Sequence, residues 1–312
     1  MNVMISINDK FLEIAKVMLY SLFYNNRDTS VDLYLICHDL SENTVNELEK
    51  LVSQFEAKRL HVVDIGSHIE NDIPLYVSYS PEILYKILGI DYLPRDIHKI
   101  LWLDADMIVK GDITDLYNTD ITGAPMAVCE DINAVLNSES EEFKVRCKMP
   151  PDSKYFNAGM CLINLDYMRQ RNFTATFRDV INHRHEEYPF LEQDALNNML
   201  FDGVVLLPWS LYNTHPGYYI LSIDDACRGI VRMAPYREVN RESAIEGYLG
   251  KYRDVTNIIK NNSKIIHYIG LSKPWRADSD NMYWTQAAFK DIWLSYRDMC
   301  EGSMKQNGIK DN

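Results

Sequence analysis

Short apolar runs of strand length alternate with stretches of helical periodicity in the first third of the chain. Strand patterns at 3–7, 31–37 and 60–65 are separated by helical patterns, the first from about Phe11 to Asn25 and the second capped by Ser41. Alternation of this kind favours parallel strands joined by right-handed crossovers. The sequence therefore predicts an α/β fold.

The rest of the chain continues this alternation. We expect further strands at 99–103, 126–129, 155–165, 204–207 and 265–268, and helices at 81–93, 173–185, 193–201 and 283–299. Ser80 and Pro81 are suited to start the helix at 81. The polar stretch 131–154 reads as an irregular excursion that could act as a lid. In the tail, Phe289, Trp293 and Tyr296 share one helical face, which is expected to pack on the core.

Composition and charge exclude several classes of function. The chain has 312 residues and a formal net charge of −13, which argues against binding to nucleic acid. No apolar run approaches the roughly 20 residues that span a bilayer. The six cysteines lack CxxC spacing and are expected to be buried thiols. The first residues read as a strand and not as a secretion signal, so we expect a cytoplasmic protein, with peripheral contact at the inner membrane face as an option.

The stretch 99–109 (Lys-Ile-Leu-Trp-Leu-Asp-Ala-Asp-Met-Ile-Val) ends an apolar strand in two carboxylates. Alternate side chains of an extended backbone share a face, so Asp104 and Asp106 can point the same way. Two anions this close favour a hard divalent cation between them. The carboxyl end of a strand is also where open α/β sheets bind ligands. We therefore expect Asp104 and Asp106 to hold a metal that in turn holds a diphosphate.

His267 is the best candidate for a third metal ligand. It follows a short apolar strand, with Gly270 three residues later and Lys273 six residues later. Imidazole coordinates metals, glycine allows close approach of the backbone, and a lysine can neutralise phosphate. The alternative, a structural histidine beside a surface lysine, stays open on this motif alone.

Four segments resemble the motifs of glycosyltransferase family 8, in the order of the family. They are 103–106 (Leu-Asp-Ala-Asp), 155–159 (Tyr-Phe-Asn-Ala-Gly), 191–194 (Leu-Glu-Gln-Asp) and 267–275 (His-Tyr-Ile-Gly-Leu-Ser-Lys-Pro-Trp). The family contains retaining enzymes that use nucleotide sugars, among them bacterial lipopolysaccharide galactosyl- and glucosyltransferases and the glycogenins. The resemblance implies an A-type glycosyltransferase fold, with a mixed, twisted sheet between helices.

The resemblance also implies roles for individual residues. Manganese(II), or magnesium in its place, would be bound by Asp104, Asp106 and His267. The diphosphate would contact Gly270 and Lys273. The other residues that the resemblance assigns to the nucleotide sugar are Ser6, Asn8 and Phe11 at the uridine, Ala105 beside the metal ligands, Asn157 and Ala158 beside the sugar, and Gln193 and Asp194 at its reacting face. Asp104, Gln193 and Asp194 are the catalytic candidates.

Two positions depart from the family pattern. The family often has an acidic residue where this chain has Asn8. The helix that usually presents an arginine to the sugar and phosphate carries Lys86, which keeps the charge but loses the bidentate geometry. Both departures bear on the choice of donor more than on the chemistry.

The sequence thus predicts a hexosyltransferase that moves glucose or galactose from UDP to a glycan or glycolipid acceptor with retention. Residues 1–276 are expected to form the catalytic domain and 277–312 a helical tail. Three alternatives stay open: glycogenin-like self-glucosylation, an inactive nucleotide-sugar-binding protein, and a haloacid-dehalogenase-like phosphatase. The phosphatase fits least well, because its Asp-x-Asp motif normally ends the first strand.

Overall fold

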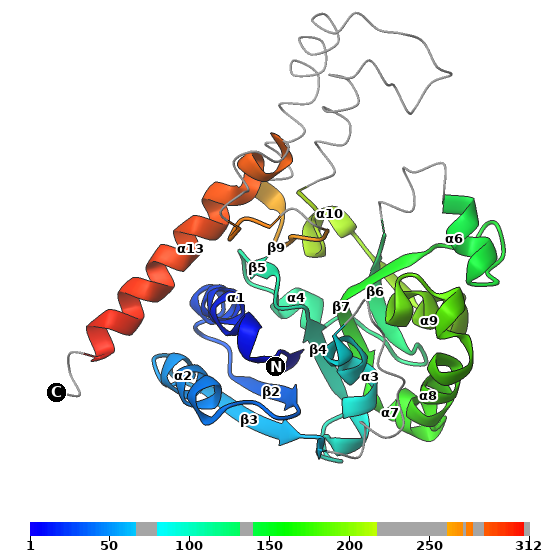
Figure 1. The fold of residues 1–312 in the computed structure, drawn as a ribbon, viewed down its shortest axis with the longest axis horizontal. Coiled ribbons are helices and arrows are strands. Elements are labelled where there is room, and N and C mark those ends of the chain that lie inside the picture. Colours follow the sequence, from blue (N-terminus) through cyan, green and yellow to red (C-terminus); the bar gives the residue numbers. More distant parts are fainter. Residues whose placement is uncertain (67–79, 132–139, 217–260, 271–272, 277–283, 309–312) are drawn as a thin grey trace, which may run out of the picture.

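A central sheet with helices on both faces dominates the architecture (Figure 1). The structure, a computed structural model, describes residues 1–66, 80–131, 140–216, 261–270, 273–276 and 284–308. The strands are β1 (Asn2–Ser6), β2 (Val31–Cys37), β3 (Lys58–Asp64), β4 (Lys99–Leu103), β5 (Met107–Val109), β6 (Met126–Glu130), β7 (Phe156–Asn164), β8 (Val205–Leu207) and β9 (Ile265–His267). All except β5, for which no separate strand was expected, agree with the predicted strands to within two residues at each end.

Seven strands form the main sheet in the order β3-β2-β1-β4-β7-β6-β8. The pairs β3–β2, β2–β1 and β1–β4 are parallel, as the alternating pattern predicted. β7 runs antiparallel to both β4 and β6, while β8 is parallel to β6. The expected mixed α/β sheet is therefore confirmed. Among the described residues, β5 and β9 form a separate antiparallel pair.

Helices cover the two faces of this sheet. Their bounds are α1 (Leu12–Asn25), α2 (Glu42–Val52), α3 (Tyr85–Leu88), α4 (Thr114–Tyr117), α6 (Ser140–Arg146), α7 (Leu165–Gln170), α8 (Phe173–Arg184), α9 (Leu191–Leu200), α10 (Trp209–Tyr212) and α13 (Trp284–Gly308). Figure 1 shows α1 and α2 on one side of the sheet and α7, α8 and α9 on the other.

The core has two halves, one on each face of the sheet, because successive strand residues point to opposite faces. In β1, Val3 and Ile5 pack with α1 and α2, whereas Met4 packs with α3 and α8. In β4, Leu103 lies on the first side and Trp102 on the second. The central strands are buried on both faces, which explains their nearly continuous apolar sequences.

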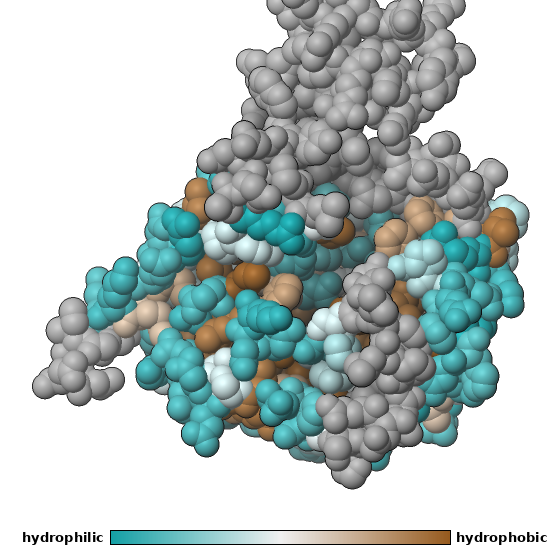
Figure 2. All heavy atoms as spheres, viewed as in Figure 1, coloured by the Kyte–Doolittle hydropathy of each residue, from teal (hydrophilic) through white to brown (hydrophobic). Residues whose placement is uncertain are grey.

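The C-terminal helix packs on the sheet domain. Phe289 and Trp293 are buried against Val17 of α1 and Ile108 of β5, and Tyr296 packs beside them. The expected apolar face of the tail is thus core, and its helix continues to Gly308. In the view of Figure 2 the outer side of α13 is mainly hydrophilic. The proposed division at residue 276 stays a prediction.

Two local predictions need correction. The helix expected at 81–93 is three short pieces, with 3₁₀ turns at Pro81–Leu84 and Gly89–Tyr92 around α3, and Ser80 makes no side-chain cap. The excursion 131–154 contains a helix, α6. Its residues 132–139 lie outside the described residues, so the idea of a lid is not tested.

Other sequence-based expectations concern cysteines and the membrane. The five described cysteines are free and buried, as expected, whereas Cys227 lies outside the described residues. Among the helices of the described residues, none combines the length and apolar character that crossing a bilayer requires.

Candidate active site

The site begins where β4 ends. Leu103 is fully buried, and the chain turns out of the sheet at Asp104. The amide N–H of Asp104 donates to the carbonyl of Gly159 on β7 (2.9 Å), and the carbonyl of Asp106 accepts from the N–H of Tyr268 (3.0 Å). Main-chain bonds to both β7 and the end of β9 therefore fix the two carboxylates relative to the core.

His267, the last residue of β9, completes a group of three ligand residues. Ligand atoms of Asp104, Asp106 and His267 all lie within 4.8 Å of one another. Nε2 of His267 is 3.1 Å from Oδ1 of Asp106 and 3.7 Å from Oδ2 of Asp104. Two carboxylates and one imidazole are a suitable donor set for a divalent cation such as manganese.

Gly159 makes room for this group. A Cβ atom at this position would lie 2.2 Å from Cε1 of His267 and 2.9 Å from Oδ2 of Asp104, which no real side chain permits. Only glycine therefore lets β7 pass behind the converging ligands. The residues present fit a bound metal, because two carboxylates and one imidazole converge at this point.

Lys273 adds positive charge at the same place. Its Nζ is 2.6 Å from Oδ2 of Asp106 and also donates to the carbonyl of Tyr268. Burial would raise the pKa of Asp106, but the charges of His267 and Lys273 outweigh burial and hold that pKa well below its usual range. Asp106 is therefore an anion poised for a cation, and Lys273 is within reach of any anion that the cation binds.

Lys86 lies beneath the carboxylates and is only 1 % exposed. Its Nζ donates to the carbonyl of Ala158 (2.8 Å) and to Oε1 of Glu192 (3.3 Å), and lies 3.8 Å from Oδ1 of Asp104. Burial would lower the pKa of Lys86, but the carboxylates of Asp104 and Glu192 raise it overall. Lys86 is thus a buried cation shared by two anions.

A second polar cluster connects β7 to the start of α9. Oε1 of Gln193 accepts from the N–H of Ala158 and from Nδ2 of Asn157, both at 3.0 Å. Nε2 of Gln193 donates to Oδ2 of Asp131 (3.0 Å) and to the hydroxyl of Tyr155 (3.2 Å). The predicted sugar-side residues Asn157, Ala158 and Gln193 therefore do lie together.

Asp194 lies in a different environment from Gln193. It is fully buried, with Oδ1 accepting from the hydroxyl of Tyr155 (2.7 Å) and from the thiol of Cys147, and Oδ2 accepting from the N–H of Phe190 (2.9 Å). Both oxygens are therefore occupied by donors from the protein itself.

The residues predicted for the nucleotide lie at the carboxyl end of β1 and in the following turn. Oγ of Ser6 is buried without a hydrogen-bond partner, Asn8 caps the turn by accepting from Lys10 N, and Phe11 is 41 % exposed. Because β1 pairs with β4 in parallel, this end of the sheet is also the end that carries Asp104.

The two remaining predicted residues flank the metal ligands. Ala105 is buried between Asp104 and Asp106. Gly270 follows β9 with a φ of +88°, a conformation that favours glycine.

Sequence reasoning missed four residues that touch the site: Trp102, Glu192, Asn213 and His215. Trp102 donates to Asp104, Glu192 pairs with Lys86, and Asn213 contacts His267. Burial and the charges of His267 and Lys273 lower the pKa of His215 to about 3. Glu192 and Trp102 could have been found, since they stand in the segments of Gln193 and Asp104. Asn213 and His215 lie in none of the segments that the sequence singled out.

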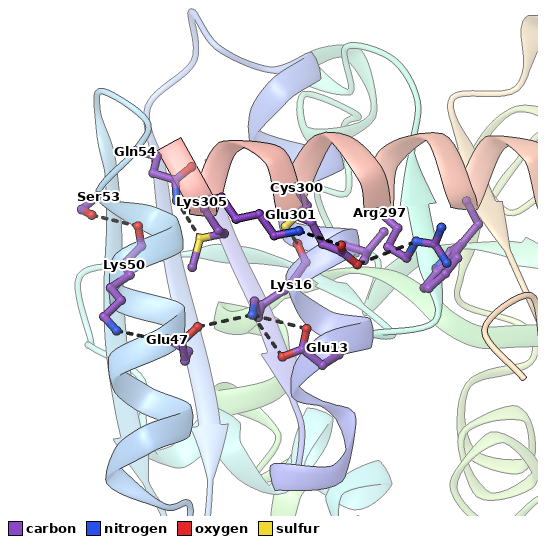
Figure 3. Close-up of a pocket in the computed structure, with 13 residues that line it drawn as sticks. Glu13, Lys16, Glu47, Lys50, Ser53, Gln54, Arg297, Cys300, Glu301 and Lys305 are labelled. Atoms are coloured by element: carbon purple, nitrogen blue, oxygen red, sulfur yellow. Dashed lines mark hydrogen bonds and ion pairs between the residues drawn. The ribbon is translucent and has the colours of Figure 1, made fainter. Parts of the chain in front are cut away.

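A pocket of about 950 Å³ lies elsewhere, between α1, α2 and α13 (Figure 3). Its charged side chains pair with one another: Lys16 lies 3.0 Å from Glu13 and 3.3 Å from Glu47, and Glu301 faces Arg297 and Lys305. None of the predicted site residues lines it. It is therefore separate from the site at the end of β4.

Solved structures share the fold of this chain. The galactosyltransferase LgtC, crystallised with donor and acceptor sugar analogues, superposes with a TM-score of 0.71 at 20 % identity, over 96 % of each chain. The glycosyltransferase GlyE of Streptococcus pneumoniae TIGR4 superposes with a TM-score of 0.62 at 18 % identity, over 99 % of this chain and 63 % of GlyE. The fold is that of the A-type glycosyltransferases.

The sequence places the chain in one family of that class. Residues 2–279 match the model of glycosyl transferase family 8, and the chain belongs to this family. The lipopolysaccharide 1,2-glucosyltransferase of Escherichia coli K12 is 23 % identical over 88 % of this chain and 72 % of its own length. General stress protein A of Bacillus subtilis strain 168 is 24 % identical over 91 % of this chain and 90 % of its own length. The protein is therefore a glycosyltransferase, and the expected family is confirmed.

Proposed function

We propose that the protein transfers glucose or galactose from a UDP-sugar to a glycan or glycolipid acceptor, with retention and with manganese(II) or magnesium as cofactor. The observation that carries this proposal is the convergence of Asp104, Asp106 and His267 at the end of β4 in a member of family 8. A lipopolysaccharide-type acceptor is suggested by the name of the Escherichia coli relative. Such an acceptor would favour work in the cytoplasm, at the inner membrane face.

The metal would be held by Asp104, Asp106 and His267. When bound, it would act as a Lewis acid on the leaving diphosphate. Lys273, now paired with Asp106, would turn to the diphosphate once a cation compensates the carboxylate. Gly270 would allow the backbone to approach the same phosphates.

The rest of the donor would lie along the carboxyl edge of the sheet. Phe11, exposed beside β1, would stack on the uracil ring, and the unpartnered hydroxyl of Ser6 and the side chain of Asn8 would face the uridine. Ala105 would lie beside the metal ligands. The hexose would lie against Asn157, Ala158 and Gln193, whose mutual hydrogen bonds hold them rigid. A preorganised wall of this kind positions the anomeric carbon and excludes water.

Retention is explained best if the acceptor attacks the anomeric carbon on the same face from which the leaving group departs. The bond from the anomeric carbon to the phosphate oxygen breaks, and the acceptor oxygen bonds to the same face of that carbon. The departing phosphate oxygen takes the proton of the acceptor hydroxyl. This route needs no enzymatic nucleophile, and the buried Asp194 supports it because both its oxygens already accept hydrogen bonds. Gln193, a neutral amide, is a poor nucleophile.

The test is manganese-dependent release of UDP from a panel of UDP-sugars, with the wild type, Asp106→Asn and the control Asp166→Asn. Asp166 is half-buried and pairs with His98, away from the ligand group. We expect slow hydrolysis of one UDP-hexose by the wild type and the control, and its loss in Asp106→Asn or with a chelator.

If hydrolysis is absent, calorimetry with UDP and manganese, followed by transfer assays, decides among three outcomes. Metal-dependent binding of UDP that Asp106→Asn abolishes, followed by transfer once oligosaccharide acceptors are added, would support the proposal. Binding without transfer to any acceptor would overturn it in favour of a binding protein. Absence of binding would overturn the metal–diphosphate assignment itself.

A further inference from the structure

A chain of buried hydrogen bonds leads from the backbone of β7 to the metal-binding histidine. Its first member is Asn157, which is 6 % exposed. The N–H of Gly159 donates to Oδ1 of Asn157 (3.0 Å), while Nδ2 of Asn157 faces Oε1 of Gln193 and Oδ2 of Asp131. A backbone N–H can only donate, and a carboxylate only accepts. The amide of Asn157 therefore has one possible orientation, with its oxygen toward Gly159.

Asn213 is the second member, and its orientation follows from the first. It is 4 % exposed and lies just after α10. Its Nδ2 donates to Oδ1 of Asn157 over 2.9 Å. Its amide oxygen is consequently directed at the ring of His267, 2.9 Å from Nδ1. Because a carbonyl oxygen can only accept, Nδ1 of His267 must carry a hydrogen.

We propose that Asn213 is a positioning residue that keeps His267 in the Nδ1–H form, so that Nε2 is available to the metal. This inference rests on the metal site of the proposed function. Nε2 is the nitrogen that faces Asp106 and Asp104, whereas Nδ1 faces Asn213. An oriented partner on the non-ligating nitrogen of a histidine is a common way to fix both its tautomer and its ring plane.

The competing tautomer shows why such a partner matters. With its hydrogen on Nε2, the neutral ring of His267 would donate to Oδ1 of Asp106, only 3.1 Å away. That bond would occupy two of the ligand atoms at once, and the metal would have to displace it. The amide of Asn213 opposes this arrangement, because its oxygen would then face a ring nitrogen without a hydrogen.

The main chain holds Asn213 against His267. The N–H of Thr214 donates to the carbonyl of Ile265 (3.0 Å), and the N–H of His267 donates to the carbonyl of Thr214 (2.9 Å). Residue 213 is thus attached to the strand that carries the metal ligand. The contact between Asn213 and His267 is set by this pairing and not by a long, adaptable side chain.

The first experiment compares manganese affinity, by titration calorimetry, in the wild type, Asn213→Leu, Asn213→Asp and Asn26→Leu. Leucine removes the acceptor, so we expect binding about 10- to 100-fold weaker. Aspartate keeps an acceptor toward Nδ1 but sets its second oxygen against Oδ1 of Asn157, so we expect an affinity between those of Asn213→Leu and the wild type. Asn26 is equally buried but bonds Leu22, Gly111 and Ile113, so Asn26→Leu controls for the loss of a buried amide. Affinity in Asn213→Leu equal to wild type would overturn the inference.

The second experiment reads the tautomer directly and needs no metal. In ¹⁵N spectra of the imidazole rings of the metal-free protein, recorded as a pH series that includes the neutral ring of His267, its Nδ1 should carry the hydrogen. In Asn213→Leu the hydrogen should move to Nε2. A wild-type ring with a bare Nδ1 would refute the role of Asn213, even if Asn213→Leu fails to fold. If the wild type binds no manganese but shows Nδ1–H, the proposed function fails while the assignment of Asn213 to His267 stands.

Discussion

Trp102 donates its indole N–H to Oδ1 of Asp104 over 2.7 Å, from two residues earlier in the same chain segment. Alternate residues of a strand share a face, so this contact follows from the geometry of β4. Nζ of Lys86 lies 5.2 Å from the centre of the Trp102 ring and 3.8 Å from the same carboxylate oxygen. One oxygen of Asp104 is therefore held on the buried side, and Oδ2 is left on the side of His267.

The first prediction concerns this indole donor. Trp102→Phe keeps an aromatic ring beneath Lys86 but removes the N–H, so Asp104 can rotate. We expect manganese affinity to fall at least about 10-fold, as for other residues that orient metal ligands. Phe177→Leu, which changes a buried aromatic residue of α8 that stacks on Phe173, should leave affinity unchanged. Equal affinity in both variants would show that Trp102 only fills space.

The second prediction concerns the space behind the ligands. Gly159→Ala places a Cβ within 2.2 Å of His267, so either the ring or β7 must shift. We expect manganese binding and UDP-sugar hydrolysis to fall at least about 100-fold, because a displacement of about 1 Å at a reacting site has effects of this size. Gly302→Ala is the control: a Cβ there meets nothing within 4 Å, and alanine favours the helix α13. Normal binding by Gly159→Ala would show that the ligands adapt.

The third prediction concerns the charge buried under Asp104. Lys86→Met leaves Asp104 and Glu192 without their shared cation, and removal of one partner of a buried pair typically costs about 3–5 kcal/mol of unfolding free energy. Adding Glu192→Gln should recover part of this loss, since one uncompensated carboxylate disappears. Urea denaturation of both variants and the wild type measures the coupling. Identical unfolding free energies for the single and double variants would exclude the shared-cation arrangement.

The fourth prediction concerns stability in acid. Asp32 on β2 lies opposite Arg59 on β3, whose Nε and Nη2 donate to its two oxygens at 2.6 and 2.8 Å. These bonds, together with His61, lower the pKa of Asp32 to about 2, from 3.8 in an unfolded chain. A lowered carboxyl pKa stabilises the fold above the unfolded value, and this contribution disappears as the pH falls toward 2.

Asp32→Asn should therefore lower the unfolding free energy by about 1 kcal/mol near neutral pH, the upper range for a partly exposed pair. The difference from wild type should shrink between about pH 4 and pH 2. Denaturant unfolding across this range measures it, with the exposed Asp152→Asn as control. A difference that is independent of pH would mean that the charge of Asp32 is not responsible.

The strands and the group of Asp104, Asp106 and His267 could be predicted from sequence, because each depends on a local pattern. The pattern around Asp104 and Asp106 contains both the buried strand and the carboxylates that end it. His267 could be proposed because Gly270 and Lys273 follow it at a spacing suited to a diphosphate. The apolar face of α13 could also be predicted, because its residues recur at helical spacing. Phe289 on this face is buried.

What could not be predicted depends on contacts between distant segments. Nothing in the neighbours of Asn213 marks it as a partner of His267, 54 residues later. The environments of Gln193 and Asp194 differ although they are adjacent, because successive residues of α9 point about 100° apart. The division of the predicted helix 81–93 into α3 and two 3₁₀ turns is also not visible in the local spacing of apolar residues. Such features appear only when the whole fold is assembled.

The pairing of β5 with β9 sets the order in which this protein can become active during its synthesis. Met107 lies opposite His267, so two ligands of the site leave the ribosome about 160 residues before the third. The parallel half of the sheet can form early, from neighbouring segments. The nascent chain, however, holds an unpaired β5 and two adjacent carboxylates until β9 has been made. We therefore expect the growing chain to lack a complete set of candidate metal ligands until His267 has emerged.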